Sequence, residues 1–277
     1  MSISGEPGPP GRPGPTGPVG PPAGRVSLRK AAAVFGNRHY RFLWVSSAFS
    51  FTGMQMQQVA RALLAWELTH SFGAVGAVSL SFGLPMLLFS LIGGSLADRF
   101  EKRNLSLMTQ STTAILGATT AVLVATDTIT IQLLFLVGLI QGTFFAMGMP
   151  ARLPLMAQVV GPAQITSAIA LSNAAMNATR LVGPAVAGAI VGLWGIDTAY
   201  FAMSAMFIGS SATLLMVPTG LGTASSHGDQ QRQGMFAEIS AGLRYAASEP
   251  RIRLLIGMMF IITFFAMPYV MLLAGFV

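Results

Sequence analysis

Two long apolar runs are joined by the stretch Gly94-Ser95-Leu96-Ala97-Asp98-Arg99-Phe100-Glu101-Lys102-Arg103. The runs on either side cover about residues 73–96 and 105–126. Each is close to the ~20 residues that an α-helix needs to cross ~30 Å of hydrocarbon. The charged side chains gather at the end of the stretch, where a spanning helix would leave the membrane. The stretch therefore predicts a short polar loop between two membrane helices.

The same alternation continues along the chain and predicts its fold class. Of 277 residues, 53% are hydrophobic and 9% are charged, with a mean hydropathy of +0.65. Soluble domains carry about 25% charged residues, so a soluble fold is excluded. Because there is no Cys, a disulfide scaffold is excluded as well. The runs are continuous rather than alternating, which disfavours a β-barrel. We expect an all-α integral membrane protein with spans near 42–66, 73–96, 105–126, 129–150, 165–194, 198–217 and 252–275.

The placement of the charges predicts the orientation. The formal net charge is +7, but the cations lie between the apolar runs rather than on a soluble face, which argues against a nucleic-acid partner. The even-numbered loops contain Arg99, Lys102, Arg103, Arg152, Arg232, Arg244, Arg251 and Arg253. The alternate loops contain Glu67, His70, Asp127 and Asp197 without Lys or Arg. Under the positive-inside rule the N-terminus and the even loops are cytoplasmic.

Composition divides the chain into five parts. Residues 1–24 carry Gly at every third position from Gly5 to Gly20 and are rich in Pro. This is the collagen period, but the stretch is short, so a disordered tail is favoured over a triple helix. Residues 25–41 are a basic amphipathic lead-in to the membrane. A six-helix domain (42–217), a cytoplasmic central loop (218–250) and one more helix (251–277) follow. The chain ends within apolar sequence, so we expect a truncated piece of a longer protein.

Residues 94–103 resemble the loop signature of the major facilitator superfamily, Gly-x-Leu-Ala-Asp-Arg followed by a basic cluster, although Glu101 stands where Gly is usual. The segment Gly183-Pro184-Ala185-Val186-Ala187-Gly188 is similar to the Gly-Pro-x-x-Gly-Gly motif of the superfamily's exporters, with Ala187 as a departure. Together they resemble bacterial drug and siderophore exporters. The resemblance implies the six-helix N-terminal domain of a twelve-helix fold, plus the start of the C-terminal domain, in the bacterial inner membrane.

The resemblance also implies roles for both motifs. Gly94, Asp98, Arg99, Lys102 and Arg103 would latch the two domains during transport, while topology signalling alone is the alternative for the cations. Gly183, Pro184 and Gly188 would bend the fifth span and seal the cavity. Simple helix packing is the alternative for this motif.

Polar residues within the predicted spans are costly and indicate function. Asn173, Asn177 and Arg180 share one helix face, as do Gln57 and Arg61. We predict that these five residues bind substrate, and the two arginines would suit an anionic one. Interhelical hydrogen bonding is the alternative for the amides, and snorkelling to the outer surface is the alternative for Arg61.

The prediction for function is a secondary active exporter of small amphipathic molecules, with a small-molecule substrate, the bilayer and a proton as partners. Proton coupling lacks a visible site, because the predicted spans hold no Asp, Glu or His away from their ends. An enzyme is disfavoured for the same reason, and no cofactor or metal is expected. An importer or facilitator of the same superfamily, and a non-transporting structural or regulatory membrane fragment, are the alternatives.

Overall fold

The computed structural model describes residues 33–220, 244, 248–250, 252–255 and 257–258, without the side chains of residues 90–92 and 94–99. The predicted tail, most of the central loop and most of the predicted seventh span lie outside these residues. The described part confirms the all-α expectation. Its elements are α2 (Arg38–Thr69), α3 (Phe72–Arg99), α4 (Lys102–Ala125), α5 (Ile131–Gly148), the 3₁₀ turn η1 (Met149–Ala151), α6 (Arg152–Val160), α7 (Ile165–Trp194) and α8 (Ile196–Leu215).

Five segments of the described part are long and apolar enough to cross a membrane: Phe72–Phe89, Lys102–Ala125, Ile131–Val160, Ile165–Trp194 and Ile196–Leu215. The first predicted span corresponds to α2, which has 32 residues but is not among them. Its hydropathy is lowered by polar side chains, several of which are buried within the bundle. A helix with an inward polar face does not need the uniform apolar composition of one surrounded by lipid.

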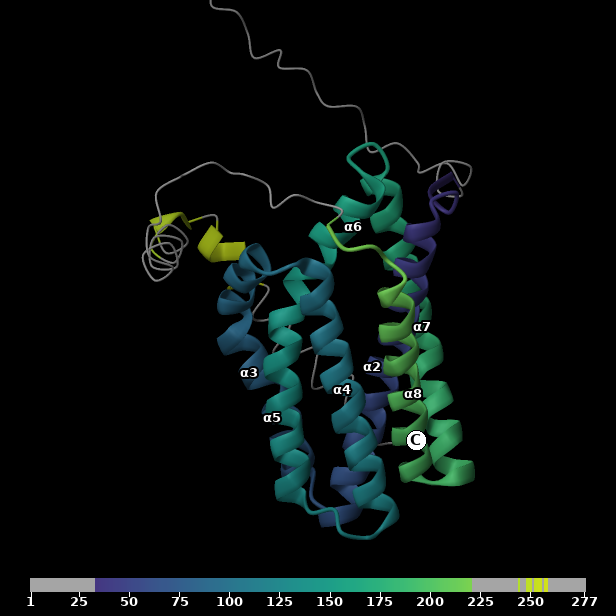
Figure 1. Ribbon diagram of the computed structural model, residues 1–277. Helices are drawn as coiled ribbons and strands as arrows, with labels where there is room; N and C mark the ends of the chain where they lie inside the picture. Colours follow the sequence, from purple (N-terminus) through teal and green to yellow (C-terminus); the bar gives the residue numbers. More distant parts are fainter. Residues whose placement is uncertain (1–32, 221–243, 245–247, 251, 256, 259–277) are drawn as a thin grey trace, which may run out of the picture.

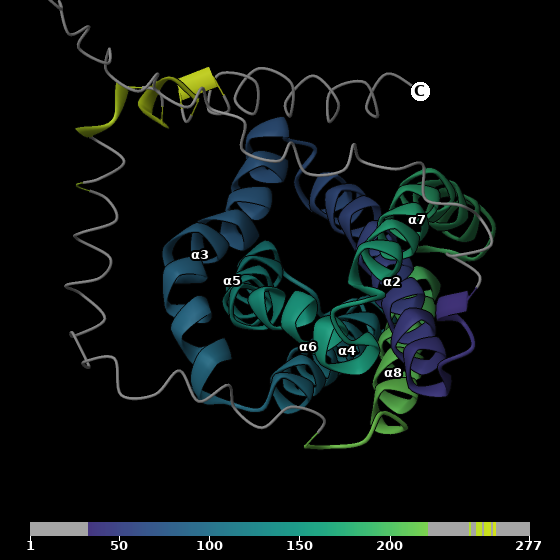
Figure 2. The ribbon, with the colours of Figure 1, turned by 90° about the horizontal axis from the view of Figure 1, so that it is seen from above.

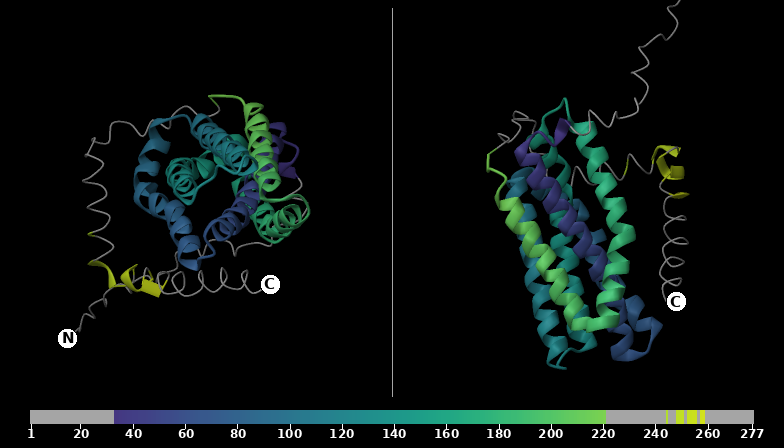
Figure 3. Two further views of the ribbon diagram at one scale, coloured as in Figure 1. Left: turned by 90° about the horizontal axis from the view of Figure 1, so that it is seen from below. Right: turned by 90° about the vertical axis from the view of Figure 1, so that its right-hand side faces the viewer.

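The long helices run alongside one another in one bundle (Figure 1). Seen from above, α3 and α5 lie together on one side, α2, α7 and α8 on the other, and α4 between them (Figure 2). The view of the right-hand side shows α2 between α7 and α8 (Figure 3). Polar bonds join α2 to both neighbours: Tyr40 donates to the carbonyl of Ala168 (3.1 Å), and Ser46 to that of Ser210 (2.9 Å).

Small residues bring α3 and α5 into close contact. A Cβ on Gly142 would lie 2.3 Å from the carbonyl oxygen of Phe82, and one on Gly93 would lie 2.2 Å from that of Ala146. A Cβ on Gly138 would meet the side chain of Ser81 instead, with Oγ at 2.0 Å. Gly138 and Gly142 therefore permit close packing of α5 against α3. Close approach of this kind is how membrane helices gain van der Waals contact.

One end of the bundle collects the starts of α2 and α4 and the ends of α6 and α8. Asn37 donates to the carbonyl of Val159 (2.9 Å), and Arg103 Nη2 to that of Leu215 (2.8 Å). These are the segments that the charge pattern assigns to the cytoplasm, so their shared location agrees with it. The assignment of this end to the cytoplasm stays a prediction.

The entry into the first helix differs from the expected lead-in. Asn37 caps α2 by accepting from the backbone N–H groups of His39 and Tyr40, so the helix begins at Arg38 rather than near residue 42. Val34 is fully buried in a cluster with residues of α6, α7 and α8. At the end of the predicted lead-in, Val34, Phe35 and Tyr40 are therefore packed into the bundle, while Arg38 and Arg41 are exposed.

Candidate functional site

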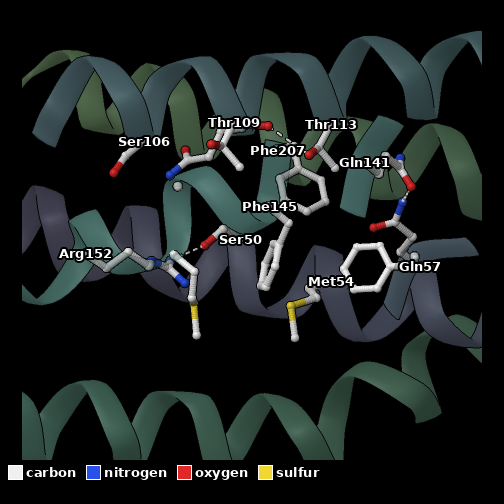
Figure 4. Close-up of a pocket in the computed structure, with 14 residues that line it drawn as sticks. Ser50, Met54, Gln57, Ser106, Thr109, Thr113, Gln141, Phe145, Arg152 and Phe207 are labelled. Atoms are coloured by element: carbon white, nitrogen blue, oxygen red, sulfur yellow. Dashed lines mark hydrogen bonds between the residues drawn. The ribbon is translucent and has the colours of Figure 1, made fainter. Parts of the chain in front are cut away.

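A pocket lies inside the bundle and is lined by residues of α2, α3, α4, α5, η1, α6 and α8. The space between its lining residues is about 570 Å³, a figure that includes solvent at its open side. Figure 4 shows Arg152 and Gln57 at its two ends, with the rings of Phe145 and Phe207 between them. The lining residues are Ser50, Met54, Gln57, Phe82, Ser106, Thr109, Gln110, Thr113, Gln141, Phe145, Gly148, Met149, Arg152 and Phe207.

At one end of the pocket, the guanidinium of Arg152 contacts α2. Its Nη2 donates to Ser50 Oγ at 2.6 Å, and its Cζ lies 4.3 Å above the centroid of the Phe51 ring. A guanidinium has five N–H donors, and Ser50 accepts from one nitrogen. Within the described part of the chain, Arg152 makes no ion pair. This end of the pocket is therefore positively charged.

At the other end, one amide oxygen accepts from two side chains. Gln57 Nε2 and Arg61 Nη2 both donate to Gln141 Oε1. The guanidinium of Arg61 also lies 5.0 Å from the centroid of the Phe82 ring. Arg61 is 8% exposed, so it does not snorkel to the outer surface but lies within the bundle just behind the pocket. Of the predicted substrate-binding residues, Gln57 lines the pocket and Arg61 supports it.

The remaining polar wall comes from α4, which sequence reasoning did not single out. Ser106, Thr109, Gln110 and Thr113 are all buried and all line the pocket. Their spacing of three, four and seven residues places them on one helix face, and that spacing was the available signal. Two buried atoms of the lining have no hydrogen-bond partner in the described structure, Ser106 Oγ and Gln141 Nε2.

Arg152 was also missed as a site residue, because the charge pattern placed it in a loop. Pro150 lies within η1, and the chain continues directly into α6, so Arg152 is the first residue of a helix rather than part of a loop. The apolar residues that follow it were the signal for this continuation.

The other three predicted substrate-binding residues lie elsewhere. Asn173, Asn177 and Arg180 are exposed on α7 and do not line the pocket. Within the described residues, α7 packs mainly on α2 and α8. Its polar stripe therefore faces away from the six-helix bundle.

The predicted seal motif divides between two faces of α7. Gly183 is buried, and a Cβ there would lie 2.5 Å from Gln55 Cβ, so this glycine permits close contact with α2. Pro184 lies inside the continuous helix. Gly188 is exposed, and a Cβ there would meet nothing within 4 Å. The described part thus shows a packing role for Gly183 alone.

The predicted latch is only partly described, because the side chains of Gly94, Asp98 and Arg99 are outside the described part. Arg103 donates to the carbonyls of Leu214 (3.3 Å) and Leu215 (2.8 Å) at the end of α8. Cations stabilise the negative C-terminal end of a helix. Arg103 therefore ties α4 to α8, whereas Lys102 makes no hydrogen bond or ion pair in the described structure.

Replacing Arg103 with Ala is expected to lower the free energy of unfolding by about 1 kcal/mol, because two carbonyls at the end of α8 lose their donor. Lys102→Ala is the matched control and should leave stability unchanged. Thermal melts of the purified protein in detergent would compare the two. Equal melting temperatures for both variants would contradict the capping role of Arg103.

Comparison with known proteins agrees with this architecture. A family model of transmembrane secretion effectors matches residues 30–275. The MFS-type transporter YfiS of Bacillus subtilis is 22% identical over 188 residues, 68% of this chain and 44% of its own length. The staphyloferrin A transporter of Staphylococcus aureus is 25% identical over 179 residues, 64% of this chain and 45% of its own. The enterobactin exporter EntS of Escherichia coli O1:K1 is 24% identical over 213 residues, 76% of this chain and 50% of its own.

The chain thus spans about half the length of the curated relatives that it matches. The family match covers most of the chain, including all six long helices of the described part. These findings identify a multi-pass membrane protein that belongs to the transmembrane secretion effector family of the major facilitator superfamily.

Proposed function

We propose that the complete gene product is a secondary active exporter of small amphipathic molecules that works by alternating access. The observation that carries this proposal is the pocket, which combines buried polar groups on α2, α4 and α5 with aromatic side chains. Ligand sites commonly have this mixture of apolar walls and few polar groups. The family match and the relatives named as a siderophore exporter and a siderophore transporter support the same proposal.

The outward polar stripe of α7 fits a partner domain. Asn173, Asn177 and Arg180 would be costly in contact with lipid, yet they are exposed in this bundle. We propose that they face a second half of the transporter and the cavity between the halves. Transporters of this kind bind substrate between two repeats that rock against each other. These residues would then line the cavity between the halves rather than the pocket inside the bundle.

The two motifs complete the proposed cycle. The latch formed by Gly94, Asp98, Arg99, Lys102 and Arg103 would control the approach of the halves at the cytoplasmic face. Gly183, Pro184 and Gly188 would shape the seal on α7. The N-terminus would lie in the cytoplasm of a bacterial cell, and a proton would be the coupling ion, bound outside the described residues.

Filling the pocket tests this proposal. Met54→Trp places a large ring among the lining residues, so dye efflux from an efflux-deficient strain should fall about tenfold, equivalent to about 1.4 kcal/mol of lost binding. Leu136→Trp on α5 is the control, because Leu136 is 50% exposed and lies outside the pocket. Both variants must be expressed in the complete gene product at equal membrane levels.

The direction is tested with the same variants. Substrate accumulation in inverted membrane vesicles, dependent on energisation and lost in Met54→Trp, would support export. Uptake by intact cells with the same dependence would instead establish an importer. Full transport by Met54→Trp would show that the pocket has no part in the function.

A further inference from the structure

We propose that the pocket binds an aromatic anion, with its acidic group against Arg152 and its ring between Phe145 and Phe207. This inference rests on the proposed transport function and names its substrate class. It is carried by three features of one pocket: a guanidinium that makes no ion pair among the described residues, two buried donors without hydrogen-bond partners there, and an aromatic wall. The sequence predicted that Arg61 and Arg180 would suit an anionic substrate. In this proposal Arg152, not Arg180, contacts the acidic group.

The described residues that line the pocket give it a positive charge. Among the described residues that line it, Arg152 is the one charged side chain, and none is Asp or Glu. Arg61 adds a second guanidinium directly behind Gln57 and Gln141. A charge removed from water is costly unless an opposite charge accompanies it. Since the described residues that line the pocket include no carboxylate, a bound anion is the natural counter-charge.

Two polar atoms of the lining could donate hydrogen bonds to an acceptor on a ligand. Ser106 Oγ and Gln141 Nε2 are more than nine-tenths buried by residue and have no hydrogen-bond partner in the described structure. Buried polar groups are rarely left in this state without a ligand or ordered water. Both atoms can donate, as can the remaining N–H groups of Arg152. Donors without acceptors favour a ligand rich in oxygen lone pairs, such as a carboxylate or a phenolate.

The wall between the two polar ends is suited to a ring. Phe145 and Phe207 lie between Arg152 and Gln57, with Met54 beside them (Figure 4). The ring centroids of Phe82 and Phe145 are 5.5 Å apart, a separation typical of interacting aromatic pairs. Flexible thioethers adapt to varied apolar ligands. The lining residues therefore favour a ligand that has an aromatic body and an acidic group at one end.

Three naphthalene ligands of one size separate charge from shape: 2-naphthoate, neutral 2-naphthamide and cationic 2-naphthylmethylamine. Their binding is measured by calorimetry on the complete gene product in phosphatidylcholine nanodiscs. We expect 2-naphthoate to bind at least about tenfold more tightly than the other two. Equal binding of all three would overturn the anion preference and leave the transport proposal standing.

Substitutions at Arg152 test whether its charge determines the affinity for 2-naphthoate. Arg152→Gln keeps a donor for Ser50 but removes the charge, so 2-naphthoate affinity should fall about tenfold or more. Arg152→Lys should retain most of it, because the charge remains. Arg41→Gln is the control, since Arg41 is an exposed cation at the start of α2 and lies outside the pocket. Unchanged affinity in Arg152→Gln, or an equal loss in Arg41→Gln, would contradict the assignment.

A lipid headgroup could supply the same negative charge, so nanodiscs containing phosphatidylglycerol form a second arm. We expect 2-naphthoate to bind Arg152-dependently in both lipids. Phosphatidylglycerol could instead raise the melting temperature of the protein but not of Arg152→Gln, and abolish 2-naphthoate binding. In that case the occupant is lipid and the proposal is overturned. Efflux of the bound ligand is measured separately, so that failure of transport and failure of anion binding are distinguished.

Discussion

Replacing Gly142 with Ala is expected to lower the free energy of unfolding by about 3 kcal/mol, at the upper end of the range for overpacked cores. The added Cβ would lie 2.3 Å from the carbonyl oxygen of Phe82 and 3.0 Å from its carbonyl carbon. These are backbone atoms of α3, so they cannot rotate aside as a side chain would. The two helices must therefore move apart and lose contact along their length.

Two further glycines provide graded controls for this prediction. Gly138→Ala should cost less, because its nearest obstacle at 2.0 Å is Ser81 Oγ, a side-chain atom that can rotate. Gly188→Ala should leave stability unchanged, because no atom lies within 4 Å of its Cβ position. Thermal melts and size-exclusion profiles of the purified proteins would rank the three. If Gly142→Ala and Gly188→Ala had the same melting temperature, the close contact between α3 and α5 would be contradicted.

Replacing Gln141 with Leu is expected to cost about 2 kcal/mol of stability, because a buried guanidinium and a buried amide lose their shared acceptor at once. Gln141 Oε1 accepts from both Gln57 and Arg61, and the guanidinium would then keep its contact with the Phe82 ring but lose this acceptor. The value exceeds the average of about 0.6 kcal/mol for neutral interhelical bonds in membranes, since one donor here is charged.

A double-mutant cycle tests the reason for this loss. Removing the cation as well, in Arg61→Leu/Gln141→Leu, should recover about 1 kcal/mol relative to Gln141→Leu, because no unpaired charge remains buried. Gln58→Leu is the matched control, since Gln58 is the exposed neighbour of Gln57. Additive losses in the double variant would show that Arg61 and Gln141 do not depend on each other.

The spans show how far local sequence patterns reach. Hydropathy located three of the five spans within about three residues of their ends, whereas the predicted spans 73–96 and 129–150 end seven residues beyond Phe89 and ten residues short of Val160. The start of α2 was placed about four residues late, because a basic composition obscured the cap formed by Asn37. Arg152 was assigned to a loop for a similar reason, since charge at a membrane boundary resembles a loop signal.

The candidate site was less predictable than the spans. Gln57 and Arg61 were identified from their polarity inside an apolar run, and both belong to the pocket region. Asn173, Asn177 and Arg180 satisfied the same criterion but lie on the outward face of α7. A stripe of polar residues indicates that a helix face meets something polar. It does not indicate whether that face turns inward or toward another domain.

The amino-acid sequence by itself determined the membrane class, the helical fold, most of the span limits and the family resemblance. These follow from free energies of transfer and from local backbone preferences, which depend on residues close together in the chain. Only the tertiary structure decided that α4 and Arg152 complete the pocket, that Arg61 is bound by Gln141 and that the stripe on α7 faces outward. Those facts depend on how each helix is rotated about its axis against its neighbours, and the packing of distant segments sets that rotation.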